Sequence, residues 1–199
     1  MGHLLLTSTG FFYQKVRVQF NKLITNKKFA VIITTASPKK ELNQFAIQAK
    51  IDLEDMGFEQ VTFLDVENES IESLQDTDVI YISGGNPFML LHHLRKSGAD
   101  RLLLKRAKED CIIVGVSAGA VVLGSSIRIV EWFSPELNTM NLTDFTGCQL
   151  YSRSLFPHSD REDLFPGSDS IEKRILAFEK VSGEHVIRLA DDEFHLIQW

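Results

Sequence analysis

The sequence predicts an α/β protein with a mostly parallel sheet and helices on both faces of that sheet. Short apolar runs rich in β-branched residues alternate with segments whose apolar residues recur at helical spacing. This alternation is typical of parallel strands that are covered on both faces by the helices connecting them. A chain of 199 residues can bury a substantial core, so we interpret residues 1–199 as one domain.

The elements of the first half follow one another in a regular order. We expect strands over the apolar runs at residues 4–8, 29–34, 61–64, 79–82 and 112–116. Helical spacing predicts helices at residues 16–26, 42–56 and 100–109, the second of which ends at Gly57. Asn86 is a good helix N-cap and Pro87 a good first helical residue, so a further helix should extend to about residue 97.

The second half is less regular. Helical spacing returns at residues 171–180. Two later apolar runs, at residues 185–189 and 194–198, flank Asp191 and Asp192. Because aspartates are common in turns, we expect these two runs to form a hairpin around the acidic pair.

Composition excludes several classes of protein. The net charge is −6 and the charged fraction 24%, and no basic patch stands out, which argues against a nucleic-acid partner. No apolar run approaches the roughly 18 residues of a membrane span, so we expect a soluble, cytoplasmic protein. The two cysteines show neither metal-ligand nor disulfide spacing. The sequence leaves a homodimer open.

The most informative motif is the apolar run that ends in Gly115-Val116-Ser117-Ala118-Gly119. A buried strand, a sharp turn carrying a serine and a following helix are the pattern of a nucleophile elbow. The turn strains the serine backbone, so its neighbours must be small, and Gly115, Ala118 and Gly119 meet that requirement. A tight turn with an ordinary serine would give the same pattern, so the partners of Ser117 decide between the two interpretations.

A catalytic serine needs a base, and the base needs an orienting acceptor. His158 is the strongest candidate base, because an apolar strand end delivers it to a sheet edge and Pro157 fixes the backbone before it. His195 is a competing candidate, whereas the adjacent His92 and His93 lie on a predicted helix and are interpreted as surface or packing residues.

The candidate acids are Asp191 and Asp192, which lie in the expected turn and can reach the sheet edge. Asp144, Asp160 and Glu131 are the alternatives.

An oxyanion hole requires two backbone N–H groups beside the serine. The residue after the nucleophile, Ala118, supplies one of them. Gly84 and Gly85 end a predicted parallel strand at the carboxyl edge of the sheet, so their loop is well placed for the second. As a phosphate loop this segment is incomplete, because it lacks further glycines and the Walker lysine.

Together these residues resemble the serine peptidases of family S51, which includes aspartyl dipeptidase (peptidase E) and cyanophycinase. Three motifs carry the resemblance, in the order that the family has them: Ile82-Ser83-Gly84-Gly85-Asn86, Gly115-Val116-Ser117-Ala118-Gly119-Ala120 and Phe156-Pro157-His158. The resemblance covers most of the chain, and the combination is much more specific than any single motif.

The resemblance implies a class I glutamine amidotransferase-like fold, a flavodoxin-like three-layer sandwich, with a Ser-His-acid mechanism. Ser117 would attack the substrate and His158 would act as base. Asp191 would be the acid, at a position that is glutamate in the dipeptidase. The N–H groups of Gly85 and Ala118 would hold the oxyanion.

A small peptide is the implied substrate, with no metal or organic cofactor. We expect Asn86 and Arg174 to contact it. Aspartyl dipeptidases recognise an N-terminal aspartate through a basic residue three positions before the one matching Arg174, and Ile171 stands there in this chain. The sequence therefore does not predict strict specificity for N-terminal aspartate, and Arg153, Arg161 and Arg174 are alternative cations.

Two other functions fit the same pattern. One is a catalytically inactive binding module of the same fold, and the other is an amidase or esterase with a non-peptide substrate. The order Ser117, His158, Asp191 differs from the Ser-Asp-His order of α/β-hydrolases, which disfavours a lipase. A glutamine amidotransferase would carry cysteine at the elbow.

Overall fold

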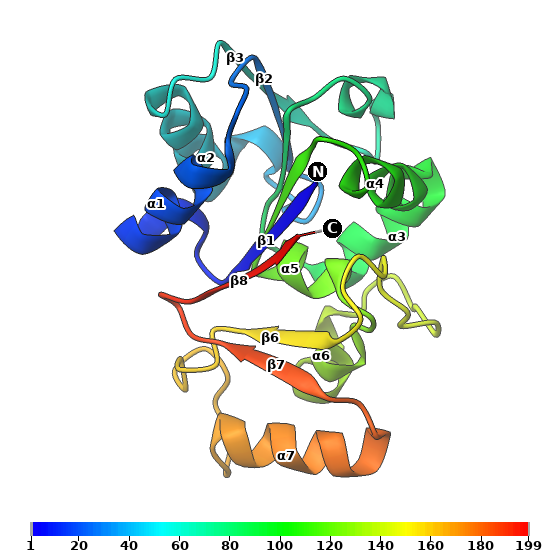
Figure 1. Cartoon of the computed structure of the whole chain (residues 1–199). Helices are drawn as coiled ribbons and strands as arrows, with labels where there is room; N and C mark the ends of the chain where they lie inside the picture. The colour runs from blue at the N-terminus through cyan, green and yellow to red at the C-terminus, as the bar shows by residue number, and fades with distance from the viewer. Residues whose placement is uncertain (1, 199) are drawn as a thin grey trace.

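A six-stranded sheet forms the centre of the molecule in the computed structural model, which describes residues 2–198 (Figure 1). Its strand order is β3-β2-β4-β5-β1-β8. The parallel strands are β1 (His3–Thr7), β2 (Phe29–Ile33), β3 (Gln60–Leu64), β4 (Val79–Ile82) and β5 (Ile112–Val116). The last strand, β8 (Phe194–Gln198), pairs antiparallel with β1 at one edge of the sheet.

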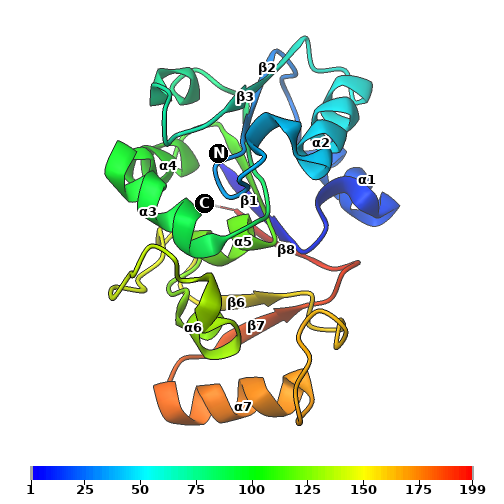
Figure 2. The ribbon, with the colours of Figure 1, turned by 180° about the vertical axis from the view of Figure 1, so that it is seen from behind.

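Helices cover both faces of this sheet (Figures 1 and 2). On one face lie α1 (Gln14–Leu23) and α2 (Gln44–Asp55), and on the other lie α3 (Pro87–Ser97), α4 (Ala99–Ala107) and α5 (Ala118–Leu123). Short 3-10 turns are η1 (Gly10–Phe12), η2 (Lys40–Leu42), η3 (Ile71–Leu74) and η4 (Pro135–Leu137). No helix within residues 2–198 has the length and apolar character needed to cross a bilayer.

The strands build two cores because successive side chains point to opposite faces of the sheet. In β1, Leu4 and Leu6 join the core under α3, α4 and α5, whereas Leu5 joins the core under α1 and α2. All three leucines are fully buried. The mostly parallel α/β fold expected from the sequence is therefore confirmed, as are the strands and helices of the first half, with ends that shift by a few residues.

A second, two-stranded parallel sheet lies beside the carboxyl edge of the large sheet (Figure 1). It consists of β6 (Ser154–Pro157) and β7 (Val186–Leu189). The helices α6 (Arg128–Phe133) and α7 (Ile171–Ser182) pack against it around a third apolar cluster that includes Phe156 and Phe178. The predicted helix at residues 171–180 is confirmed as α7.

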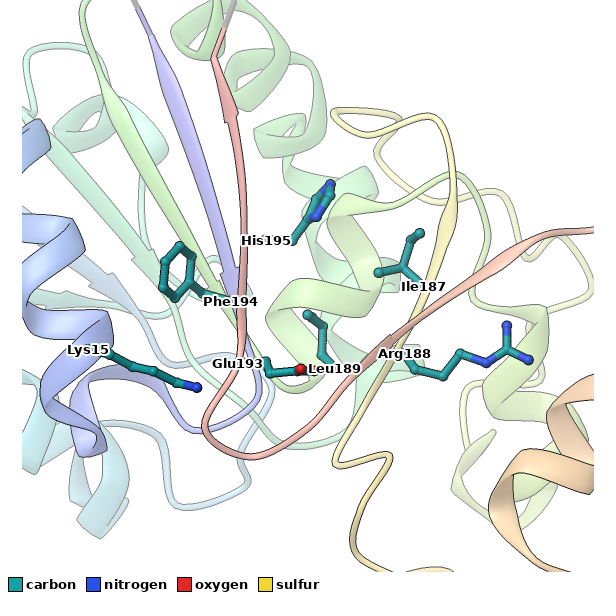
Figure 3. Close-up of a pocket in the computed structure, with 7 residues that line it drawn as sticks. All are labelled: Lys15, Ile187, Arg188, Leu189, Glu193, Phe194 and His195. Carbon is teal, nitrogen blue, oxygen red and sulfur yellow. The ribbon is translucent and has the colours of Figure 1, made fainter.

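The predicted hairpin of residues 185–189 and 194–198 is wrong. Both runs are strands, but β7 pairs with β6 and β8 pairs with β1, in different sheets. The open edges of β1 and β6 are both available, and there each strand packs against apolar clusters, β7 through Val186 and Leu189 and β8 through Phe194 and Leu196. An isolated two-stranded ribbon has no such support. Where β7 and β8 diverge, they leave a cavity of about 280 Å³ bordered by Ile187 and Arg188 on one side and Phe194 and His195 on the other (Figure 3).

An ion-pair network attaches α7 to β7. The Glu179 carboxylate accepts hydrogen bonds from Nη1 of Arg188 at 2.7 Å, the backbone N–H of Val186 at 2.8 Å and Nδ1 of His185 at 2.9 Å. Arg188 also donates to Glu172. The hydrogen bond from Arg188 is the main reason that the pKa of Glu179 falls to about 2.

Replacing Glu179 by glutamine should remove stability at neutral pH and leave it unchanged in acid. The pKa is lower in the folded protein than the ordinary value of 4.5, so the ionised carboxylate stabilises the fold above that pH and loses this contribution as the pH falls toward 2. We expect Glu179→Gln to lower the free energy of unfolding by about 1–2 kcal/mol at pH 7. Urea titrations at pH 7 and at about pH 2 test this, and a difference that stays constant with pH would contradict it.

Candidate active site

Ser117 occupies a strained turn between β5 and α5. Its backbone has φ 51° and ψ −114°, a conformation that side chains rarely adopt. The N–H of Ser117 donates to the carbonyl of Thr7 at 2.9 Å, and its carbonyl accepts from Val121 at 3.0 Å as the helix begins. A Cβ on Gly119 would lie 2.2 Å from the Ile82 carbonyl oxygen, so only glycine fits there. These contacts give Ser117 the geometry of a nucleophile elbow.

The glycine loop after β4 borders Ser117. A Cβ on Gly84 would lie 3.1 Å from the Cβ of Ser117, which places the loop directly against the serine. Gly85 has φ 144°, and a Cβ there would lie 2.2 Å from the carbonyl oxygen of Ala36. The loop is fixed on its other side by the Asn86 N–H, which donates to the same Ala36 carbonyl at 2.7 Å. The loop that carries Gly85 and the helix start that carries Ala118, the two expected oxyanion donors, therefore both adjoin Ser117.

His158 lies between Ser117 and Asp191. Its Nε2 is 3.0 Å from Oγ of Ser117, and its Nδ1 is 2.5 Å from Oδ1 of Asp191. A carboxylate only accepts hydrogen bonds, so Nδ1 carries the proton and Nε2 is left to accept the serine proton. The imidazole is thereby held in the tautomer that a general base requires.

The structure distinguishes the two neighbouring aspartates. Asp191 contacts His158 and has a side chain only 10% exposed, whereas Asp192 points away and pairs with Lys15 at 2.6 Å. Burial raises the pKa of the Asp191 carboxyl, but hydrogen bonds from His158 and Arg161 outweigh burial and hold that pKa below its usual value. Asp191 is therefore ionised at neutral pH.

The buried hydroxyl of Ser8, which the sequence analysis did not single out, holds the histidine in place. The backbone N–H of His158 donates to Oγ of Ser8 at 3.0 Å, and this hydroxyl donates to the Leu189 carbonyl at 3.0 Å. That carbonyl also accepts from the N–H of Ser159. His158 itself has φ 59°, so these bonds stabilise a backbone that is otherwise disfavoured. The one signal in the sequence was that Ser8 ends the predicted strand of residues 4–8 and so lies at the carboxyl edge of the sheet.

Three further residues support the acid. Thr9 donates its hydroxyl to the Asp191 carbonyl at 2.8 Å, and Asp160 accepts from the Asp191 N–H at 2.9 Å. Arg161 donates Nη1 to Oδ2 of Asp191, also at 2.9 Å. Asp160 and Arg161 lie in the polar loop after His158, where sequence reasoning weighed them as an alternative acid and an alternative cation rather than as supports for Asp191.

The other candidate bases and acids lie elsewhere. The His195 ring packs on Tyr151 with centroids 4.9 Å apart and borders the cavity of Figure 3. His93 is buried and lies 3.7 Å from Glu67. Two of the alternative acids have partners outside the site: Glu131 accepts a hydrogen bond from Asn138, and Asp144 forms a salt bridge with Arg95.

The two residues expected to contact the substrate, Asn86 and Arg174, already make hydrogen bonds within the protein. Asn86 caps α3 by accepting from two helical N–H groups, and its Nδ2 donates to the Leu137 carbonyl at 2.7 Å. Arg174 lies 4.0 Å above the Phe133 ring and donates to the Phe165 carbonyl at 2.8 Å. Ile171 is 1% exposed within the apolar cluster of the small sheet. Arg153 is exposed, on the segment that leads into β6.

The fold and site define the class of protein. A mostly parallel sheet with a serine elbow at its carboxyl edge is the arrangement of the class I glutamine amidotransferase-like fold, which solved peptidase E structures share. The model of peptidase family S51 matches residues 4–197, so the chain belongs to this family.

Relatives and a solved structure agree with this assignment. The uncharacterized peptidase Lmo0363 of Listeria monocytogenes is 32% identical over 164 residues, which cover 79% of this chain and 78% of the relative. Peptidase E of Shewanella denitrificans is 28% identical over 157 residues, or 75% of this chain and 66% of the relative. A crystal structure of a candidate peptidase E from Listeria monocytogenes has a TM-score of 0.76 at 28% identity, covering 99% of this chain and 94% of that one. Family and relatives indicate a peptidase.

Replacing Gly85 by alanine should destabilise the protein more than the same change at Gly183. Both glycines have positive φ, but a Cβ on Gly183 meets nothing within 4 Å, whereas a Cβ on Gly85 would collide with Ala36. Backbone strain alone costs about 1–2 kcal/mol. We expect Gly183→Ala to cost that amount and Gly85→Ala to cost at least about 3 kcal/mol in urea denaturation, because the loop must also shift. Equal costs would contradict the close packing of this loop.

Proposed function

We propose that this protein is a serine-type peptidase that hydrolyses short peptides through a triad of Ser117, His158 and Asp191. The observation that carries the proposal is the continuous contact from Oγ of Ser117 through both ring nitrogens of His158 to the Asp191 carboxylate. A hydroxyl, a correctly tautomerised imidazole and a buried ionised acid in this order are what nucleophilic catalysis by serine requires. Membership of a peptidase family supports a peptide as the substrate.

Acylation begins when Oγ of Ser117 attacks the scissile carbonyl carbon. The hydroxyl proton passes to Nε2 of His158, and the Asp191 carboxylate stabilises the imidazolium that forms. The carbonyl oxygen becomes an oxyanion, which accepts hydrogen bonds from the N–H groups of Gly85 and Ala118. The first-turn N–H of a helix has no intrahelical partner, so that of Ala118 is suited to this task.

Collapse of the tetrahedral intermediate breaks the C–N bond. His158 returns its proton to the leaving amine, which departs as the C-terminal product, and the acyl group remains on Ser117 as an ester. A water molecule then attacks the ester, again losing a proton to His158, and the serine hydroxyl is regenerated. Each step uses protein side chains, backbone N–H groups and water.

Asn86 and Arg174 are our proposed substrate contacts. Asn86 is the residue after Gly85, whose N–H is a proposed oxyanion donor. Arg174 is a cation on α7, and this helix packs against β6, the strand that ends just before His158. Each side chain already donates one hydrogen bond within the protein, so a peptide would accept hydrogen bonds from the remaining N–H groups.

Labelling with a fluorophosphonate tests the nucleophile. We expect a single adduct on Ser117, located by peptide mass spectrometry, and no adduct on Ser117→Ala. His158→Ala should slow labelling by about 10³-fold or more, because the serine loses its base. A folded wild-type protein that forms no adduct with a fluorophosphonate or with the smaller phenylmethanesulfonyl fluoride would contradict the proposal and favour a binding module.

His185 provides a matched control for this experiment. Its Nδ1 lies 2.9 Å from the Glu179 carboxylate, which is the same kind of His–carboxylate pair as in the triad, but it lies in the network of α7 and β7. His185→Ala should therefore label at the wild-type rate. Peptide, amide and ester panels with wild type and Ser117→Ala then separate a peptidase from an amidase or esterase.

Dipeptides with an N-terminal aspartate should not be strongly preferred. A site built for a charged side chain discriminates by about 10⁴-fold or more, because its own charge is otherwise unpaired. Here Ile171 is buried and the Arg174 guanidinium is stacked on Phe133. We expect kcat/KM for aspartyl and neutral N-terminal residues to differ by less than about tenfold. Cleavage confined to aspartyl dipeptides would contradict this.

A further inference from the structure

Arg161 is the one cation that contacts the triad among residues 2–198. Its Nη1 donates to Oδ2 of Asp191 at 2.9 Å, while Oδ1 of the same carboxylate faces Nδ1 of His158. The other edge of the guanidinium forms a fork with Asp163, from Nε at 2.8 Å and from Nη2 at 2.7 Å. The side chain is 41% exposed, so it lies at the surface above a carboxylate that is only 10% exposed.

We propose that Arg161 is a positioning residue that orients the Asp191 carboxylate toward His158, with Asp163 holding Arg161 in place. This inference rests on the proposed serine peptidase function. In this arrangement Oδ1 of Asp191 bonds to His158 and Oδ2 bonds to Arg161. Hydrogen bonds therefore connect five side chains in sequence: Asp163, Arg161, Asp191, His158 and Ser117.

The geometry explains why such a residue is useful here. Aspartate has a short side chain, so its carboxylate can rotate about the last bond and present either oxygen, or neither, to the imidazole. A donor fixed on Oδ2 leaves Oδ1 directed at Nδ1. The backbone of Asp191 is held separately by Thr9 and Asp160, so Arg161 acts on the carboxylate rather than on the loop.

Electrostatics point in the same direction. The hydrogen bond from Arg161 is one of the two that lower the pKa of Asp191 against the effect of burial, and so it keeps the acid ionised. The titratable groups around this carboxylate are His158, Asp160, Arg161 and Asp163. Fork-shaped pairing with Asp163 fixes the plane of the guanidinium, which a lysine would not achieve.

The neighbouring residue provides a matched control. Lys15 pairs with Asp192 at 2.6 Å, with both side chains about half exposed. This is also a cation on an aspartate of the same loop, but neither partner contacts the triad. Surface pairs of this kind contribute little on their own.

The test measures the rate of fluorophosphonate labelling of Ser117 in wild type and in the variants Arg161→Ala, Arg161→Lys, Asp163→Asn and Lys15→Ala. Thermal unfolding of each variant confirms that it is folded. We expect labelling of Arg161→Ala to slow by at least about tenfold, because a misdirected acid misplaces the base. Arg161→Lys should recover part of that loss, and Asp163→Asn should show a smaller loss than Arg161→Ala. Lys15→Ala should label within about twofold of wild type.

Chemical rescue separates positioning from folding. Because the Arg161 side chain is exposed, millimolar guanidinium chloride should restore labelling of Arg161→Ala, whereas sodium chloride at equal concentration should not. Wild-type labelling of Arg161→Ala, or an equal loss in Lys15→Ala, would overturn the role of Arg161 and leave the proposed function intact. A folded wild-type protein that does not label at all would overturn both.

Discussion

The hydroxyl of Ser8 is the point at which the two sheets and the candidate site are joined. It accepts a hydrogen bond from the backbone N–H of His158 and donates one to the carbonyl of Leu189. One buried group therefore links the ends of β1, β6 and β7. Apolar packing between the two sheets sets distance but not direction, whereas the bonds of Ser8, like the bond from Thr9 to Asp191, also set direction. The 3.0 Å distance between Nε2 of His158 and Oγ of Ser117 requires the two sheets to be correctly oriented, because the two residues follow strands of different sheets.

Two strained residues face each other across this junction. Ser117 and His158 both have positive φ, a conformation that costs about 1–3 kcal/mol at each such position. Surrounding contacts hold each backbone in this conformation. The N–H of Ser117 is hydrogen-bonded to Thr7 and glycines pack closely around it, and the N–H of His158 is hydrogen-bonded to Ser8. The two large apolar cores on either side of the sheet offset this cost.

Much of the fold could be predicted from the sequence, because buried parallel strands and their helices leave strong periodic patterns. The elbow was equally visible, since the glycines around Ser117 are required by backbone geometry. Pairing was harder to predict. The apolar runs around residues 185–198 carry no information about which open edge each will join, so the predicted hairpin failed. The contacts of Ser8 and Arg161 were not predictable, because they link loops that only the folded sheets bring together.

The bonds that hold the candidate site span almost the whole chain. Ser8 reaches Leu189 across 181 positions, Thr9 reaches Asp191 across 182, and His158 reaches Ser8 across 150. During synthesis, Ser117 is therefore made before His158 and Asp191, the proposed base and acid. In the proposed mechanism, the serine of a nascent chain stays unactivated until residue 191 has left the ribosome and β7 has paired with β6. Activation of the proposed nucleophile thus requires long-range contacts of the fold and not the elbow alone.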